Sequence, residues 1–163
     1  VAGYLNSYRL LLADVVVVTM AEPQSGWEHV RRAVQAVVRP EVTVVGAVLR
    51  PRPVVDVSKR SVAYFCTAPP TAHAVLAAHL AESYGADVVH ISGNLGRRDL
   101  LRAELPRVEA DVFLIELKAA AVDLVTESAL AKGVEIVLAA NDLAPVGDEA
   151  LDEILLEVAK FNQ

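Results

Sequence analysis

The chain has 163 residues, of which 54% are hydrophobic and 22% are charged, with a formal net charge of -6 and one cysteine. This composition argues against a disordered chain, the single cysteine excludes an internal disulfide, and the acidic balance disfavours a general nucleic-acid surface. Every apolar run is far shorter than the roughly 20 residues of a membrane-spanning helix, so we expect a soluble, cytoplasmic protein with no membrane or nucleic-acid partner.

The first part of the chain alternates strand and helix. The β-branched run at residues 15–20 predicts a strand, the amphipathic segment from Trp27 to Val38 predicts a helix that Pro40 ends, and residues 42–49 predict a second strand. The stretch RPRPVVDVSKR at residues 50–60 alternates Arg with Pro, which favours an extended path. We therefore expect a linker at residues 50–60.

The same alternation continues after the linker. The pattern predicts strands at residues 62–67, 87–92, 111–116 and 134–140, and helices at 71–84, 97–104, 119–132 and 149–161. Such βα units form open sheets with helices on both faces. We predict an α/β fold with a mainly parallel, Rossmann-like sheet, and a separate domain at residues 61–163.

Polar residues follow the predicted strands. Ligands of open parallel sheets bind beyond the carboxyl ends of the strands, because these ends meet at one edge. The candidates at that edge are Thr67, Asn94, Arg97, Arg98, Glu116, Lys118 and Asn141, with Thr19 and Glu22 after the first strand.

The loop SGNLGRRDLL, residues 92–101, has the features of an anion site. Gly93 and Gly96 let backbone N–H groups approach an anion, and a helix N-terminus with Arg97 and Arg98 follows. The alternative is a flexible turn followed by solvated arginines, and spacing alone favours this alternative.

Other polar residues have structural interpretations. Thr67 or Thr71 can cap the helix that starts near Pro70, and capping is favoured over ligand contact. Cys66 is expected to be a buried, inert thiol, and His79 a core histidine. The sequence contains no zinc-ligand spacing. It also contains no phosphate-loop or dinucleotide fingerprint, so if the protein binds a nucleotide triphosphate, the main phosphate-binding loop lies elsewhere.

Four segments together resemble a known family: YLNSYRLLLADVVVVTMAE, VRPEVTVVGAVLRPRPV, TAPPTAHAVLAAHL and VFLIELKAAAVDLVTESALAKGVEIVLAAND. They are similar to the C-terminal part of cyclic 2,3-diphosphoglycerate synthetases, which use ATP to close 2,3-diphosphoglycerate into its cyclic pyrophosphate and release ADP and phosphate. The resemblance implies that residues 1–49 end a P-loop-type nucleotide-binding domain. It also implies that ATP and Mg²⁺ are cofactors and that Thr19 and Glu22 lie on the side of the bound nucleotide.

The resemblance further implies that this chain, which opens without methionine, is a fragment that is inactive without the N-terminal part of its own protein. Its partners would be a phosphorylated substrate and, in a homo-oligomer, further copies of itself. We expect catalytic roles for Glu116 and Lys118 and assign no metal ligand. The expected substrate-phosphate residues are Thr67, Asn94, Arg97, Arg98 and Asn141. The alternative is a non-catalytic α/β module that binds a phosphorylated metabolite or mediates assembly.

Overall fold

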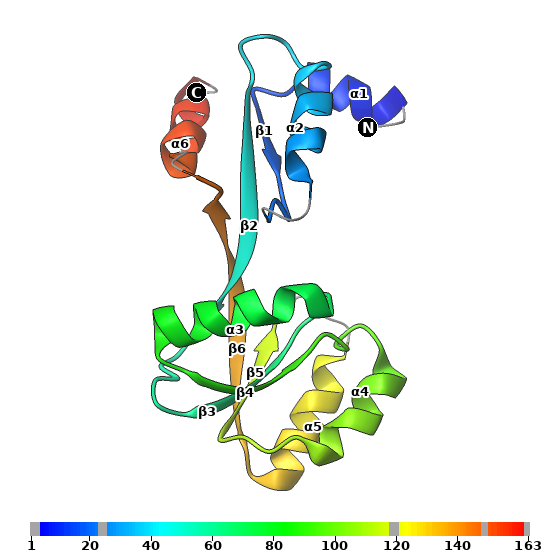
Figure 1. Ribbon diagram of the computed structural model, residues 1–163, viewed down its shortest axis with the longest axis vertical. Coiled ribbons are helices and arrows are strands. Elements are labelled where there is room, and N and C mark those ends of the chain that lie inside the picture. The colour runs from blue at the N-terminus through cyan, green and yellow to red at the C-terminus, as the bar shows by residue number, and fades with distance from the viewer. Residues whose placement is uncertain (1–3, 23–25, 118–120, 148–149, 162–163) are drawn as a thin grey trace. The chain divides into compact units, whose positions relative to one another are not determined.

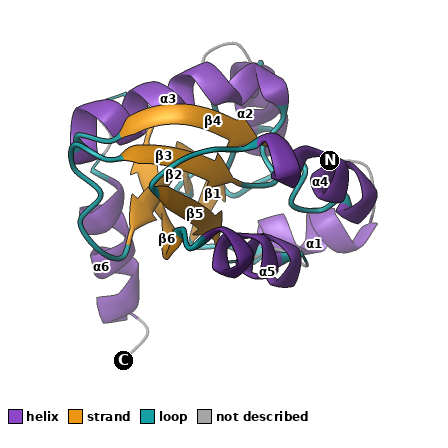
Figure 2. Ribbon diagram, turned by 90° about the horizontal axis from the view of Figure 1, so that it is seen from below, coloured by secondary structure: helices purple, strands orange, loops and turns teal. Residues whose placement is uncertain are grey.

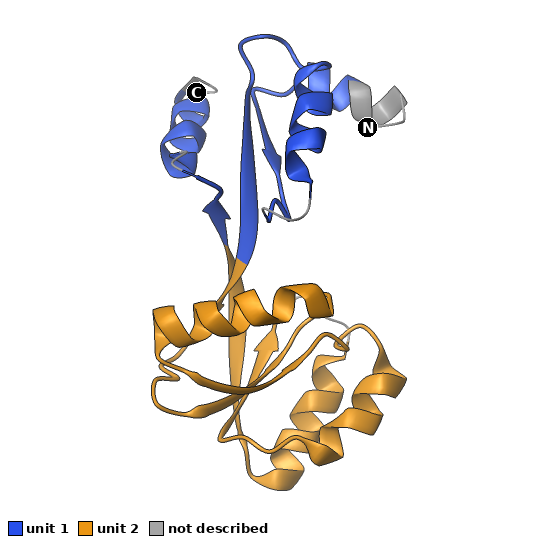
Figure 3. Cartoon of the chain, viewed as in Figure 1, with its two compact units in different colours: residues 1–49, 143–163 blue, residues 50–142 orange. Residues whose placement is uncertain are grey.

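A computed structural model describes residues 4–22, 26–117, 121–147 and 150–161 (Figure 1). The chain divides into two compact units (Figure 3). Unit 1 comprises residues 1–49 and 143–163, and unit 2 comprises residues 50–142. No helix of the described residues is both long enough and apolar enough to cross a membrane.

Within the part of the chain that the structure describes, six strands follow the hydrogen-bonding order β1-β2-β6-β5-β3-β4. The pairs β1/β2, β3/β4, β3/β5 and β5/β6 are parallel. Val146 N donates to Gly46 O, and Val54 N donates to Leu138 O. As the residue number rises from 46 to 54 along β2, the number of the partner falls from 146 to 138, so β2 and β6 are antiparallel. The predicted mainly parallel α/β sheet is therefore confirmed. The strands are β1 (Val15–Val18), β2 (Thr43–Pro53), β3 (Ser61–Phe65), β4 (Asp87–Ser92), β5 (Val112–Glu116) and β6 (Glu135–Pro145).

Unit 2 has a helical layer on each face of its strands. Alternate residues of a strand point to opposite faces, so Tyr64 of β3 packs in one core and Phe65 in the other. The Tyr64 core lies under α3 (Pro70–Tyr84), and the Phe65 core lies under α4 (Arg98–Glu104), η2 (Leu105–Arg107) and α5 (Val122–Lys132). Figure 2 shows α3 and α5 on opposite faces. Both faces of β3 and β5 are covered, which explains why these strands are almost wholly apolar.

Glycines end the two longer helices of unit 2. Gly85 follows α3 with φ 64°, and Gly133 follows α5 with φ 67°, both in the left-handed region. Glycine adopts this conformation without the steric cost of a Cβ. Each helix therefore ends in a left-handed glycine cap.

Unit 1 contains α1 (Tyr4–Leu11), α2 (Trp27–Gln35), α6 (Leu151–Phe161), β1 and the first part of β2. Leu151 packs in one core with Val45 and Ala47 of β2. The Trp27 ring lies so close to Gly46 that a Cβ there would be 2.9 Å from the ring. Gly46 therefore lets α2 pack directly on the backbone of β2.

This division differs from the domain boundaries expected from the sequence. β2 continues to Pro53, and within residues 54–60 Lys59 N donates to Gly85 O at 2.8 Å, so the expected linker is an ordered part of unit 2. Residues 143–163 group with unit 1, because Leu151 contributes to the core around Val45.

Candidate functional site

The carboxylate of Glu116, at the carboxyl end of β5, joins the loop after β3 to Asn141. Asn141 lies inside β6, which continues to Pro145, and not just after the strand as the sequence predicts. Its Oε2 accepts hydrogen bonds from Thr67 N and Thr67 Oγ1, both at 2.9 Å. Its Oε1 accepts from Asn141 Nδ2 at 2.7 Å. The structure thus brings together three residues that the strand-end argument selected, and both oxygens of Glu116 are engaged by protein donors.

Thr67 has a different role from the helix cap considered for it. The N-cap of α3 is Pro69, which makes no side-chain capping bond, and Pro70 occupies the first turn as predicted. The Thr67 hydroxyl donates to Glu116 instead. The capping interpretation of Thr67 and Thr71 is therefore wrong, and Thr67 fixes its loop to β5.

A cavity of about 570 Å³ lies beside this cluster, between the loop after β3 and the loop after β4. It contains Thr67, Asn94 and Arg97 of the expected site, whereas Glu116, Arg98 and Asn141 are not among its lining residues. The described lining residues are Thr67, Ala68, Pro69, Pro70, His73, Ile91, Ser92, Gly93, Asn94, Gly96, Arg97 and Glu104.

Glu104, at the end of α4, is a charged lining residue that the sequence does not predict. Its Oε2 accepts from Ser92 Oγ at 2.7 Å and Asn94 Nδ2 at 2.9 Å, and its Oε1 lies 2.8 Å from His90 Nε2. Burial raises the pKa of the Glu104 carboxyl, but these hydrogen bonds outweigh burial and leave the pKa below its ordinary value. One signal was available: a carboxylate in the last turn opposes the helix dipole, which suggests a tertiary partner.

The neighbouring residues Arg97 and Arg98 make different contacts. Arg97 lines the cavity, and its guanidinium forms no ion pair with any residue that the structure describes. Arg98 turns to Asp123 of α5, with Nη1–Oδ1 at 2.8 Å and Nη2–Oδ2 at 2.6 Å. This pairing raises the pKa of Arg98 and lowers the pKa of Asp123. Of the two arginines, Arg97 is therefore the one that lines the cavity.

Gly93 allows the two loops of the cavity to touch. A Cβ on Gly93 would lie 2.3 Å from Ala68 O and 3.1 Å from His73 Nε2. The close approach, and not an unusual φ, requires glycine here. In the same region Cys66 N donates to Ser92 O at 2.8 Å, and Leu95 N donates to Cys66 O at 3.1 Å.

Cys66 and His79 are both predicted to be structural, and neither side chain is fully exposed. Cys66 is buried, and burial raises the pKa of its thiol to about 11, which fits an inert thiol. His79 is half-buried, with Nε2 3.1 Å from Pro51 O. Among the described residues, no three or more His, Cys, Asp or Glu side chains gather as a metal site. Lys118 lies outside the described residues.

The nucleotide-side candidates lie in unit 1. Thr19 is exposed directly after β1, and Glu22 is half-buried. Between them, Ala21 is fully buried and its N donates to Ala47 O at 3.1 Å. The chain therefore turns back onto β2 at this point.

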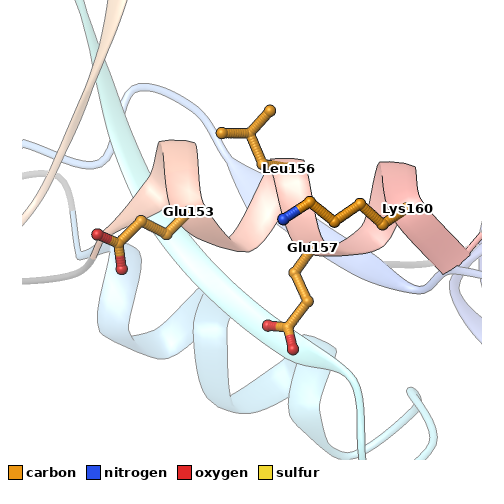
Figure 4. A pocket seen from close by; sticks show the side chains of 4 residues that line it. All are labelled: Glu153, Leu156, Glu157 and Lys160. Carbon is orange, nitrogen blue, oxygen red and sulfur yellow. The ribbon is translucent and has the colours of Figure 1, made fainter.

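A second cavity, of about 520 Å³, borders α6 of unit 1. Its described lining residues are Glu153, Leu156, Glu157 and Lys160 (Figure 4). All four belong to one helix, whereas the cavity of unit 2 draws polar groups from several elements. Converging groups from separate elements are typical of ligand sites, so the cavity of unit 2 is the stronger candidate.

Comparisons with known proteins agree on one family. The family model described as "Cyclic 2,3-diphosphoglycerate synthetase C-terminal domain" matches residues 53–142. A Rubrobacter xylanophilus protein named cyclic 2,3-diphosphoglycerate synthetase is 46% identical over 98% of this chain and 36% of its own length. Proteins with the same name from Methanothermobacter thermautotrophicus and Methanothermus fervidus are 37% and 34% identical, over 94% and 98% of this chain and 34% and 36% of their own lengths. The chain thus spans about a third of the length of these curated relatives.

Proposed function

This chain belongs to the cyclic 2,3-diphosphoglycerate synthetase family, and from that premise we propose that it is part of an enzyme that closes 2,3-diphosphoglycerate into its cyclic pyrophosphate at the expense of ATP. The family match over residues 53–142 includes every described residue that lines the cavity of unit 2. The reaction joins two phosphates of one molecule, with ADP and inorganic phosphate as the other products.

One observation carries the proposal that unit 2 holds the phosphorylated substrate: Arg97 lines a cavity at the carboxyl ends of β3 and β4. A guanidinium matches phosphate oxygens in bidentate geometry, and its charge does not depend on pH. The cavity, of about 570 Å³, falls within the usual range for small-molecule sites. We assign one phosphate of the substrate to Arg97.

The roles of the neighbouring residues follow from their contacts. Glu116 has both oxygens engaged, so we assign it the task of holding Thr67 at the cavity wall. Asn141 donates to Glu116 from β6 and so supports it, and Asn94 lines the cavity. Arg98 is held by Asp123, so its contribution to substrate binding would be through long-range charge.

The proposed catalytic role of Lys118 rests on its place two residues after Glu116 in the sequence. An ammonium there would neutralise charge as two phosphates approach each other. Positioning and charge neutralisation supply most of the catalysis in phosphoryl transfer.

The proposed ATP side of the reaction involves unit 1, where Thr19 and Glu22 follow β1. ATP supplies the phosphoryl group that activates one substrate phosphate. We assign no Mg²⁺ ligand in this chain, because the described residues provide no cluster of three or more metal-binding side chains. A Mg²⁺ ion that accompanies ATP commonly takes most of its ligands from phosphate oxygens and water.

Phosphorus NMR of the full-length protein tests the proposed reaction. With ATP, Mg²⁺ and 2,3-diphosphoglycerate, we expect a pyrophosphate signal from the cyclic product, together with ADP and inorganic phosphate in equal amounts. Binding of 2,3-diphosphoglycerate without consumption of ATP would instead support a non-catalytic metabolite-binding module. ATP turnover on a different phosphorylated acid, without the cyclic product, would also contradict the assignment.

A further inference from the structure

We infer that Glu104 is a positioning residue that fixes the turn from Asn94 to Arg97 and so places the Arg97 guanidinium at the cavity. This inference rests on the proposed function of Arg97 as a ligand for a substrate phosphate. It assigns a role to a helix-terminal carboxylate that lies outside the strand ends.

The Glu104 carboxylate gathers three side chains of β4 and the loop after it. Ser92, only 1% exposed, donates from Oγ to Oε2 at 2.7 Å, and Asn94 Nδ2 donates to the same oxygen at 2.9 Å. His90 Nε2 lies 2.8 Å from Oε1. Asn94 N also donates to Ser92 Oγ at 3.2 Å, which closes a small network. The network ties the end of α4 to the start of the loop.

The restraint passes from Asn94 to Arg97 through the backbone. Arg97 N donates to Asn94 O at 2.7 Å, and Leu101 N donates to Arg97 O at 3.0 Å. Leu101 is fully buried in the core that includes Phe65. The turn is therefore held at one end by Glu104 and at the other by the core, and Arg97 lies between these anchors.

A carboxylate is well suited to this role because three donor groups converge on it, and it accepts from all of them without a hydrogen of its own. A glutamine could replace it: its amide oxygen would accept from Ser92 and Asn94, and its NH₂ group would donate to the other tautomer of His90. Alanine would remove all three contacts and leave the buried Ser92 hydroxyl without its acceptor.

An opposite effect competes with positioning. Glu104 lines the cavity, so its negative charge repels a phosphate bound there. If charge were its main effect, both Glu104→Ala and Glu104→Gln would tighten substrate binding. If positioning is its main effect, Glu104→Ala weakens binding and Glu104→Gln preserves it. The two variants therefore give different patterns for the two roles.

Steady-state kinetics of the full-length synthetase test the inference. We expect Glu104→Ala to raise KM for 2,3-diphosphoglycerate about tenfold, as for the loss of one charge-assisted hydrogen bond, with a much smaller change in kcat. Glu104→Gln should stay close to the wild-type KM. Asp99→Asn is the matched control, because its carboxylate is fully exposed on the same helix and does not line the cavity. A KM in Glu104→Ala equal to or below that of the wild type would overturn the inference.

A double-mutant cycle with Arg97→Ala separates positioning from general destabilisation. If Glu104 acts through Arg97, Glu104→Ala adds no further increase in KM once Arg97 is absent. A full tenfold increase in the Arg97→Ala background would refute the positioning role. An unchanged KM in Arg97→Ala alone would instead refute the proposed function of Arg97.

Should Glu104→Ala not fold, Glu104→Asp takes its place in the cycle. It keeps the charge but withdraws the carboxylate by one methylene, so it should lose the network and raise KM in the same way. A wild-type KM in Glu104→Asp, with Glu104→Gln also unchanged, would show that the contacts do not position Arg97.

Discussion

Replacement of Gly93 by alanine tests the close approach of the two cavity loops. The added Cβ would lie 2.3 Å from Ala68 O and 3.1 Å from His73 Nε2. The His73 ring can move away, but Ala68 O belongs to the backbone of the loop after β3. Because carbon and oxygen atoms need more than about 3 Å of separation, the backbones must part by roughly 1 Å.

This strain sets the expected loss in the free energy of unfolding. An extra methyl group in a packed site costs about 1–3 kcal/mol, and the rigid backbone of Ala68 places Gly93→Ala in the upper half of this range. The same displacement widens the cavity between Ala68 and Arg97, so substrate affinity should fall as well. Urea unfolding of the full-length protein, followed by a probe in unit 2, measures the first effect, and the KM for substrate measures the second.

Gly96 provides the matched control in the same loop. It has no atom within 4 Å of an added Cβ, and its φ lies outside the left-handed region. Gly96→Ala should therefore change stability by less than about 0.5 kcal/mol, or stabilise slightly by restricting the unfolded chain. Equal effects of Gly93→Ala and Gly96→Ala on stability would refute the reasoning from close approach.

Three further predictions concern stability and reactivity. Ser61→Ala should destabilise the protein at pH 7, because the side-chain hydrogen bond of Ser61 lowers the pKa of Asp111. The wild type keeps this advantage above the ordinary carboxyl pKa and loses it as the pH falls through the lowered pKa of folded Asp111, so acid titration of both proteins should show their stabilities converging. Cys66 should react with an aromatic disulfide reagent at pH 7 far more slowly in the folded than in the urea-unfolded protein, since burial raises its thiol pKa to about 11; equal rates would contradict this. Lys132→Met removes donation from Nζ to three backbone carbonyl oxygens and should lower the unfolding free energy by about 1 kcal/mol, and an unchanged urea midpoint would show that these contacts are not stabilising.

The fold was predictable because each element has a strong local signal. Apolar, β-branched runs mark β3 and β5, which are covered on both faces, and glycines mark the ends of α3 and α5. The end of the domain was not predictable. The place of α6 depends on the packing of Leu151 against Val45, more than 100 residues earlier in the chain, and local periodicity carries no information about this partner.

The site was predictable in part for a similar reason. Parallel strands share a carboxyl edge, so Thr67 and Glu116 could be placed together from strand positions alone. Arg97 and Arg98 are equivalent in the sequence, and they differ in the structure because Arg98 pairs with Asp123 on α5, 25 residues away. Glu104 was missed because its partners lie on β4 and its loop, 10 to 14 residues away, with no repeating pattern to connect them.

The affinity of the full-length protein for 2,3-diphosphoglycerate tests most directly the claim that the cavity of unit 2 holds a substrate phosphate. Isothermal titration of the wild type, Arg97→Ala and Arg102→Ala compares an arginine of the cavity with an exposed arginine of α4 that does not line it. We predict that Arg97→Ala raises the dissociation constant at least about tenfold, as for the loss of a charge-assisted contact, and that Arg102→Ala leaves it unchanged. Equal dissociation constants for the wild type and Arg97→Ala would contradict the account.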